Sequence, residues 1–446
     1  MNPVSYLTAL LLAASTQIHD QCPIGSYILA DGSFIDIART SGRELRWRRK
    51  DGTTGALSRG AGQRWMSTMG WTGRPDGTRV SFDCARNEIR FADTLGKRIA
   101  FDVVESRFDV EGASLAGRLV MPTGARPVPI VVLIHGAETS SARDLYALQR
   151  IFPSAGIGAF VYDKRGTGAS SGEYTHDYLT LAVDAIAAVH EAKRLAGNRA
   201  GRIGYQAGSQ GGWVTPLAAR IEPVDFVIVG FGLAVSPLRA ERELIALDMA
   251  RHGHGPDIVR KAMEVADAVD AVVVSNFQAG YDRLAAVRRK YGNESWFGDL
   301  QGSITKILLE TSAEQMRVKG PKLVPSIPFH YDPLAVLQNL NVAQLWILGE
   351  NDIVSPAPET SRRLAGLSKA GKPITTAIFP GVDHGIYEYE IRADGSRVST
   401  RAPAGYFALM RDFILRRPIG QGYGAEFISR PVTSPAEHLA NAEAPN

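Results

Sequence analysis

The most informative stretch of the chain is IGYQAGSQGGWVT, residues 203–215. It begins with a run typical of a buried strand, continues with Ser209 between small residues, and ends in a helical pattern. Such a sharp turn holds the serine in a strained backbone conformation, so its neighbours two residues away, Ala207 and Gly211, have to be small. The stretch therefore predicts a serine hydroxyl exposed above a sheet, beside the free N–H groups of a helix.

A serine hydroxyl is a weak nucleophile at neutral pH, so it needs a base, and the base needs an orienting carboxylate. Asp352 follows an apolar strand pattern at 344–348, and His384 follows another at 375–379. Because ligands bind at the carboxyl ends of strands in open α/β sheets, both side chains are expected beside Ser209. We predict a catalytic triad of Ser209, His384 as base and Asp352 as orienting acid.

Two neighbouring carboxylates, Asp383 and Glu350, compete with Asp352 for the orienting role. Asp383 adjoins His384 in the chain, and adjacency favours local contacts over a bond made from across the site. Asp352 is therefore the preferred acid.

A second motif is VVLIHGAE, residues 131–138. After a buried strand, the His-Gly turn can direct backbone amides toward the serine. We expect the N–H groups of Ala137 and Gln210 to form an oxyanion hole, where loss of one donor typically costs about 3 to 4 kcal/mol. His135 is expected to support this loop, and the Glu138 carboxylate is expected to point outward.

The wider pattern alternates short apolar runs with stretches of helical spacing. It predicts an α/β fold with a mostly parallel, doubly wound sheet, whose core lies in two parts, 109–235 and 331–420. Residues 236–330, largely helical and rich in charge, interrupt the pattern and are a candidate lid. The last residues, 421–446, are expected to form a loose tail.

Residues 21–108 indicate a small β-rich domain, because short alternating runs end at turn signals. It contains the basic stretch RELRWRRK at 43–50. Alternation places Arg46 and Arg48 on one face, so we expect an exposed strand with a solvated basic face and no nucleic-acid patch.

Five motifs occur in the order found in the α/β-hydrolase superfamily, which the chain resembles over residues 110–417. They are IHG at 134–136, YDKRGTGASSG at 162–172, GSQGG at 208–212, GENDIVSP at 349–356 and GVDHG at 381–385. The resemblance implies the α/β-hydrolase fold and serine-hydrolase chemistry. In detail the motifs look like those of the serine aminopeptidase-like and dienelactone hydrolase-like bacterial groups, which contain both esterases and peptidases.

The chain departs from the commonest form of these motifs at the serine. Ala207 and Gly208 stand where Gly followed by His is usual, which leaves the nucleophile in place and removes a side chain beside the pocket. In the 162–172 motif, Asp163 and Arg165 are expected to brace the loop.

The N-terminus contains an apolar run, VSYLTALLLAA at residues 4–14, followed by small and polar residues. This layout is typical of a secretory signal, expected over residues 1–20, and places the protein in the periplasm or outside the cell. If the run is not a signal, the protein is cytoplasmic. Export would put Cys22 and Cys84 in an oxidising compartment, where they could pair.

Composition sets the outer limits of function. The 446 residues are 45% hydrophobic and 22% charged, which is typical of a globular protein, and a net charge of +4 is too small to indicate nucleic-acid binding. Two cysteines exclude a disulfide-dense scaffold and a four-thiolate zinc site. We expect no cofactor, no metal and no integral membrane segment, and the oligomeric state stays open.

These patterns predict a serine hydrolase that cleaves a small carboxylic ester through an acyl-enzyme on Ser209. A serine peptidase acting on short peptides through the same triad stays open. An aminopeptidase would need carboxylates for the free N-terminus, and Glu138, Glu241 and Glu243 are the candidates. The third possibility is a non-catalytic binding protein with this fold.

Overall fold

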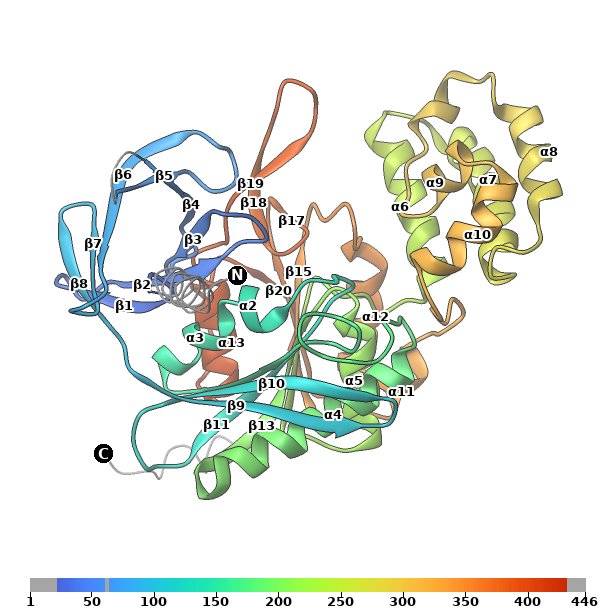
Figure 1. Ribbon diagram of the computed structural model, residues 1–446. Coiled ribbons are helices and arrows are strands. Elements are labelled where there is room, and N and C mark those ends of the chain that lie inside the picture. Colours follow the sequence, from blue (N-terminus) through green and yellow to red (C-terminus); the bar gives the residue numbers. More distant parts are fainter. Residues whose placement is uncertain (1–21, 61–63, 431–446) are drawn as a thin grey trace, which may run out of the picture.

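The structure is a computed structural model that describes residues 22–60 and 64–430. The expected signal peptide at 1–20 and residues 431–446 of the expected tail lie outside the described residues. Three parts are visible in Figure 1: an N-terminal barrel, a large sheet with flanking helices, and a helical insertion that stands above the sheet.

The large sheet has nine strands in the order β20-β16-β15-β14-β13-β11-β12-β10-β9. The six central strands, β12, β11, β13, β14, β15 and β16, pair in parallel. The outer strands β9, β10 and β20 run antiparallel to their neighbours. The strand bounds are β9 Phe101–Val110, β10 Ala113–Pro122, β11 Val128–Ile134, β12 Gly158–Tyr162, β13 Ala200–Gly208, β14 Phe226–Gly230, β15 Ala343–Gly349, β16 Ile374–Phe379 and β20 Glu426–Ser429. This arrangement confirms the predicted mostly parallel sheet.

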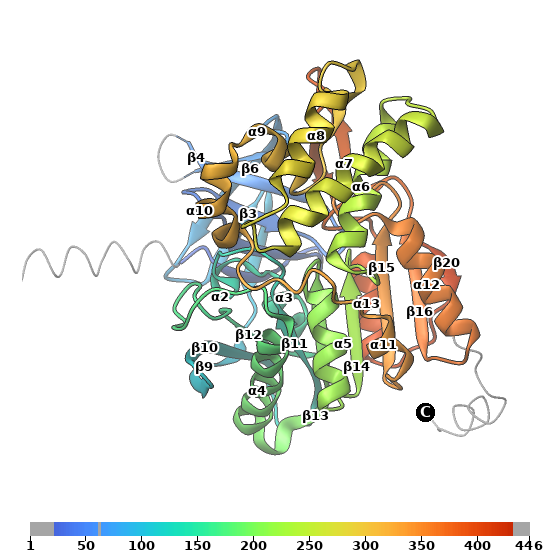
Figure 2. The same cartoon turned by 90° about the vertical axis from the view of Figure 1, so that its right-hand side faces the viewer.

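Successive residues of a strand point to opposite faces of the sheet, so both faces present apolar side chains. Helices cover both faces. Ile130 and Val132 pack in a core with α4, α5, α11 and α12, whereas Val131 and Leu133 pack in another with α2 and α13. Figure 2 shows α4, α5 and α12 beside the sheet. The helix bounds are α2 Ala142–Leu145, α3 Leu148–Ile151, α4 Tyr178–Ala196, α5 Gly211–Ile221, α11 Leu334–Gln338, α12 Ala357–Lys369 and α13 Tyr406–Ile414.

The N-terminal part is a closed barrel in which each strand from β1 to β8 pairs with the next and β8 returns to β1. Its strands are β1 Gly25–Leu29, β2 Phe34–Arg39, β3 Leu45–Arg48, β4 Thr54–Arg59, β5 Trp65–Thr68, β6 Pro75–Asp83, β7 Glu88–Phe91 and β8 Thr94–Arg98. A disulfide joins Cys22 to Cys84. The expected domain boundary at 108 was wrong, because β9 pairs along its whole length with β10 and so belongs to the large sheet.

The barrel docks on a small sheet that the sequence patterns did not reveal, formed by β17 Val382–Asp383, β18 Tyr387–Ile391 and β19 Arg397–Arg401. Trp71 of the barrel packs edge to face on Tyr387, and the Ala402 N–H donates to Gly52 O over 3.0 Å. A side chain at Gly52 would overlap the Ala402 carbonyl, so glycine permits this close approach.

Docking overturns the expectation of a solvated basic face on β3. Arg46 is only 5% exposed; its Nη1 donates to Gly70 O over 3.0 Å, and its guanidinium lies over the Trp71 ring. Arg48 is half-buried. The outer face of a barrel strand becomes an interior surface when a second domain covers it, and strand alternation alone carries no information about that contact.

Residues 236–330 form the predicted helical insertion, with α6 Pro237–Arg251, α7 Pro256–Val274, α8 Tyr281–Tyr291, α9 Thr305–Glu310 and α10 Ala313–Leu323. Two apolar clusters hold these helices together. None of the helices in the described parts of the chain is both long enough and apolar enough to cross a membrane.

The prediction of a loose tail from residue 421 was wrong in part. Residues 426–429 form β20, which pairs with the edge strand β16. The tail is too polar to make its own core, but an edge strand offers unpaired backbone groups that a short segment can satisfy.

Candidate active site

Ser209 lies between the end of β13 and the start of α5, where the sequence predicted a sharp turn. Its φ is +51°, a left-handed conformation that non-glycine residues rarely adopt. A Cβ at Gly211 would lie 2.6 Å from the Ala207 Cβ, so the turn requires the small residues that flank the serine.

The departure at Gly208 makes room for an aromatic ring. A side chain at this position would overlap the ring of Phe231, which follows β14. Phe231 in turn contacts the His384 ring edge to face, with 4.9 Å between the ring centroids. The sequence analysis missed Phe231, although its place at the carboxyl end of a sheet strand is the signal that could have identified it.

His384 and Asp352 form a hydrogen-bonded pair. His384 Nδ1 lies 2.9 Å from Asp352 Oδ2 and 3.1 Å from Oδ1. Asp352 is 2% exposed, and its Oδ1 also accepts the N–H groups of Val354 at 2.8 Å and Ser355 at 2.7 Å. Because Asp352 holds the Nδ1 proton, Nε2 is the nitrogen available as a base.

Ser209 and His384 line the same cavity, but the described contacts include no hydrogen bond between the Ser209 hydroxyl and the imidazole. Catalytic hydrogen bonds are often loose without substrate, so this geometry is compatible with proton transfer.

The rival carboxylates bind elsewhere. Asp383 accepts the N–H groups of Ile353 and His384 and pairs with Arg397 at 2.8 Å. Glu350 accepts the N–H of Gly381. Both tie the two loops together, and Asp352 is the carboxylate that contacts the imidazole.

The two expected oxyanion donors are free. Among the described residues, neither the Ala137 N–H nor the Gln210 N–H donates to a protein acceptor. A chain of side chains joins their loops: Gln210 Nε2 donates to His176 Nδ1, His176 Nε2 lies 3.1 Å from the Tyr174 hydroxyl, and that hydroxyl donates to Ala137 O. The sequence analysis missed Tyr174 and assigned no role to His176.

His176 is neutral in this chain. Its Nδ1 accepts from Gln210, so the ring proton sits on Nε2 and is donated to Tyr174. Burial and the nearby Lys164 ammonium lower the pKa of His176 to about 4. At neutral pH the chain of hydrogen bonds from Gln210 to Ala137 is therefore intact.

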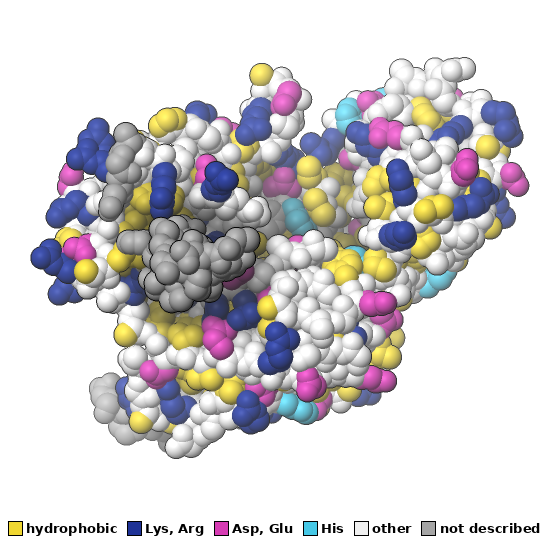
Figure 3. Space-filling model, in the orientation of Figure 1, with side chains coloured by type: hydrophobic (Ala, Val, Ile, Leu, Met, Phe, Trp, Pro, Cys, Tyr) yellow, Lys and Arg dark blue, Asp and Glu magenta, His cyan; other side chains and the backbone are white. Residues whose placement is uncertain are grey.

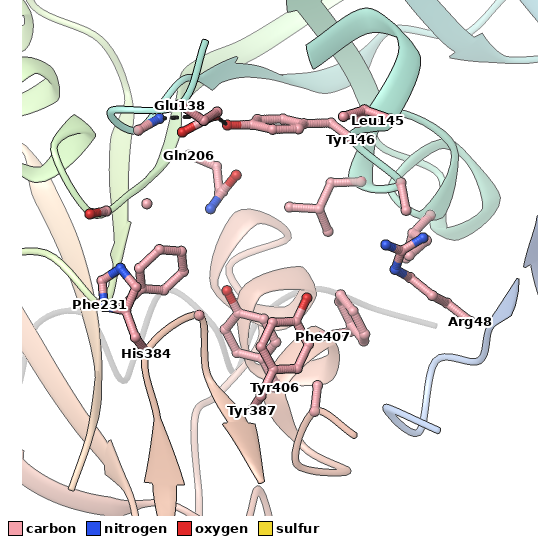
Figure 4. Close-up of a pocket in the computed structure, with 18 of the residues that line it drawn as sticks. Arg48, Glu138, Leu145, Tyr146, Gln206, Phe231, His384, Tyr387, Tyr406 and Phe407 are labelled. Atoms are coloured by element: carbon pink, nitrogen blue, oxygen red, sulfur yellow. Dashed lines mark hydrogen bonds between the residues drawn. The ribbon is translucent and has the colours of Figure 1, made fainter. Parts of the chain in front are cut away.

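The expectation that Glu138 points outward was wrong. Its carboxylate lines the Ser209 cavity, accepts the Tyr146 hydroxyl and the Gly136 N–H, and lies 3.4 Å from His135 Nδ1 (Figure 4). Burial would raise the pKa of Glu138, but the contacts with His135 and Tyr146 outweigh it and lower that pKa to about 2. The local partners turn the carboxylate inward.

Residues of the 162–172 motif support the loop that carries Ala137. The Lys164 N–H donates to His135 Nε2 over 3.0 Å, and Lys164 Nζ donates to Gly136 O over 2.9 Å. Burial lowers the pKa of this ammonium to about 8. Asp163 accepts from Ser141 at 2.7 Å, and Arg165 makes two hydrogen bonds to the buried Asp184.

Two cavities meet at Ser209. The larger, about 590 Å³, lies between the barrel and the sheet domain, and the smaller, about 330 Å³, lies beneath the helical insertion. Figure 3 shows a hollow with hydrophobic side chains between the barrel and the insertion. Within the described ranges, no group of three or more His, Cys, Asp or Glu side chains could hold a metal ion.

No protein-family model and no curated protein sequence matches the chain. Solved structures that resemble it include an acylaminoacyl peptidase from Pyrococcus horikoshii, with 15% identity and a TM-score of 0.43 over 87% of this chain and 57% of that one. An esterase from Pyrococcus furiosus has 14% identity and a TM-score of 0.41, over 64% of this chain and 84% of that one. A proline iminopeptidase from Mycobacterium smegmatis has 17% identity and a TM-score of 0.43, over 70% of this chain and 98% of that one.

The chain spans 57% of the length of the acylaminoacyl peptidase, and identities and scores this low say nothing about substrate. The fold follows from the chain's own topology. The sheet begins with the antiparallel strands β9 and β10, and its next six strands, β12 to β16 in spatial order, are parallel. A strained turn at Ser209 links β13 to α5. The chain has the α/β-hydrolase fold.

Proposed function

We propose that this protein is a serine hydrolase of the α/β-hydrolase superfamily that cleaves carboxylic esters through an acyl-enzyme on Ser209. The observation that carries the proposal is the buried Asp352 bonded to His384 Nδ1, with His384 and the strained Ser209 on the wall of one cavity.

In the proposed reaction, His384 Nε2 takes the Ser209 proton as the oxygen attacks the ester carbonyl. The oxyanion that forms would accept the free N–H groups of Ala137 and Gln210. His384 then gives the proton to the departing alcohol, and Asp352 stabilises the imidazolium in between. In the second half of the reaction, His384 takes a proton from water, which attacks the acyl-enzyme. His384 then returns the proton to the Ser209 oxygen, and the acid is released.

The positions of the carboxylates favour an ester over a peptide with a free N-terminus. Glu241 is committed to α9, where it accepts the N–H groups of Ser303, Ile304 and Thr305. Glu243 pairs with Arg239 and lines neither of the two cavities at Ser209. Glu138 is held by Tyr146 and His135.

One observation favours an aminopeptidase as the second candidate. Asp270 lines the cavity beneath the insertion together with Ser209, and its Oδ1 is buried without a hydrogen-bond partner. Its Oδ2 pairs with Arg242 at 3.2 Å. The free oxygen could accept a substrate ammonium.

Covalent labelling with a fluorophosphonate tests the nucleophile. Wild-type protein should be labelled on Ser209, and the Ser209→Ala variant should not. Intact-mass spectrometry and peptide mapping measure both. Labelling that persists in the folded variant contradicts the assignment, and folded wild-type protein that stays unlabelled points to the non-catalytic binding protein.

A matched substrate panel separates the two reactions. Hydrolysis of p-nitrophenyl acyl esters, with kcat/KM for aminoacyl anilides at least about a hundredfold lower, supports the esterase. The reverse preference supports the aminopeptidase.

We also propose that the protein works in the periplasm or outside the cell. The disulfide between Cys22 and Cys84 supports this, because such bonds persist in oxidising compartments and are rare in the cytoplasm. Mass spectrometry of the mature N-terminus from the native host checks it, since retention of the full leader would contradict export.

A further inference from the structure

Arg48 is a cation without a partner in the wall of the larger cavity. Among the described residues its guanidinium makes no hydrogen bond or ion pair, and its Nη1 is buried. Other arginines near the barrel have partners within the chain: Arg46 donates to Gly70 O, and Arg150 makes two hydrogen bonds to Asp36. A guanidinium that lacks any acceptor in a cavity wall is poorly compensated, which favours an acceptor supplied from outside the chain.

The cavity places this cation far from the reacting serine. Figure 4 shows Arg48 at one end of the cavity and His384 with Phe231 at the other. Between them the wall is mainly apolar and aromatic, with residues such as Leu145, Tyr406 and Phe407. A ligand that reaches both ends therefore needs an apolar body.

The charges at the two ends are opposite. Glu138 lies on the wall near Ser209, and its contacts keep it ionised. Arg48 is the only Lys or Arg among the described lining residues. An anionic group would be repelled from the serine end and attracted to the Arg48 end, which fixes the direction in which a substrate enters.

The contacts between the barrel and the sheet domain hold Arg48 in place relative to Ser209. Gly52, four residues after Arg48, packs against Ala402, and the Arg401 guanidinium donates to Asp51 O over 2.6 Å. Arg48 therefore belongs to a wall of fixed position, which a recognition site requires.

We infer that the barrel supplies substrate specificity: the ester carries an apolar chain or ring that fills the larger cavity and ends in a carboxylate, which Arg48 binds. A single guanidinium, with no second Lys or Arg among the described residues that line the cavity, matches one negative charge, as on a carboxylate, better than the two of a phosphate monoester. The inference rests on the proposed ester hydrolase for its reaction. The recognition step can be tested without turnover.

The test measures binding to the Ser209→Ala variant by isothermal titration calorimetry. The ligands are matched pairs of N-methyl amides with chains of about six to about twelve carbons, one of each pair ending in a methyl group and the other in a carboxylate. At the best chain length, the carboxylate ligand should bind at least about tenfold more tightly. Equal affinity within every pair would overturn the inference.

Two further variants in the Ser209→Ala background locate the effect. Arg48→Gln should reduce the preference for the carboxylate to less than about threefold. Arg79→Gln, which removes the same charge from an exposed position of the barrel, should keep it. Preference that survives in folded Arg48→Gln protein would show that another group binds the anion and overturn the inference.

Arg48→Lys provides a second test in case the Arg48→Gln variant does not fold. It keeps the charge but loses the planar donor pair, so the carboxylate preference should fall without vanishing. Preference lost equally in Arg48→Lys and Arg79→Gln would overturn the assignment of Arg48. Because these measurements need no hydrolysis, they stand whether or not the fluorophosphonate labels Ser209, so a failure of the inference is distinct from a failure of the proposed function.

Discussion

Two histidine–carboxylate pairs lie beside Ser209, and they differ in what their second nitrogen does. In the pair His384 and Asp352, the histidine side chain is 25% exposed and its Nε2 is left for the cavity. In the pair His135 and Glu138, the histidine is 2% exposed and its Nε2 is occupied, with Tyr162 O at 2.9 Å and the Lys164 N–H at 3.0 Å. A histidine can act as a base only where one nitrogen is free, so proximity to a carboxylate does not define the catalytic pair.

The largest expected effect comes from Asp352→Asn, which attacks the first pair. The amide can donate to Nδ1 and so favour the wrong imidazole tautomer, with the Nε2 proton facing Ser209. We expect kcat to fall by about 10³ to 10⁴ with little change in KM. Steady-state kinetics with a p-nitrophenyl ester measures this, and Asp383→Asn is the matched control. An equal loss in the control would contradict the choice of Asp352.

The residues of both pairs could be predicted from sequence because each follows a short apolar strand. Ser209, Asp352 and His384 are set by local patterns, and a parallel sheet brings the ends of its strands to one edge. Glu138 was placed on the correct loop but given the wrong direction. Its orientation depends on Tyr146, which is eight residues away, and on the buried Lys164 loop.

The barrel was predicted less well for the same physical reason. Alternation identified β3, but burial of Arg46 depends on Trp71 and on β18 and β19, which come more than 300 residues later in the chain. The strands β4, β5 and β8 lack a strong alternating pattern and were not predicted from sequence. Contacts between distant segments decide which polar side chains are buried, and local periodicity does not report them.

His176 sharpens the comparison, because it is buried like His135 but has no carboxylate partner. The pKa of His176 is about 4 in the folded chain, against an ordinary value of 6.5. The unfolded chain therefore binds a proton first as the pH falls, and the free energy of unfolding should decrease between pH 6.5 and pH 4, by up to about 3 kcal/mol. Above pH 6.5 this contribution is constant.

His176→Gln removes that titration and keeps a donor and an acceptor in the link between Gln210 and Ala137. Urea unfolding at pH 7, 5.5 and 4 should show a smaller decrease in stability for this variant than for wild type. His330→Gln, at an exposed position before α11, is the control and should follow wild type. Identical pH profiles for His176→Gln and wild type would contradict a buried, neutral His176.

Glu138→Gln changes the pair formed by His135 and Glu138 and should have the smallest effect. The folded chain holds the pKa of Glu138 at about 2, against an ordinary 4.5, so its carboxylate stabilises the fold above pH 4.5 and loses that contribution as the pH falls toward 2. Because the side chain is 35% exposed, solvent screening reduces the effect, and we expect a loss of about 1 to 2 kcal/mol at pH 7.

The Glu138→Gln variant also tests the division of roles directly. If Glu138 only holds the turn at Gly136 and Ala137, kcat should change by less than about tenfold, far less than in Asp352→Asn. Glu314→Gln, on an exposed part of α10, controls for the loss of a charge. A fall in kcat as large as that of Asp352→Asn would mean that Glu138 acts on the reacting groups, because a carboxylate that only supports a loop affects stability more than the chemical step.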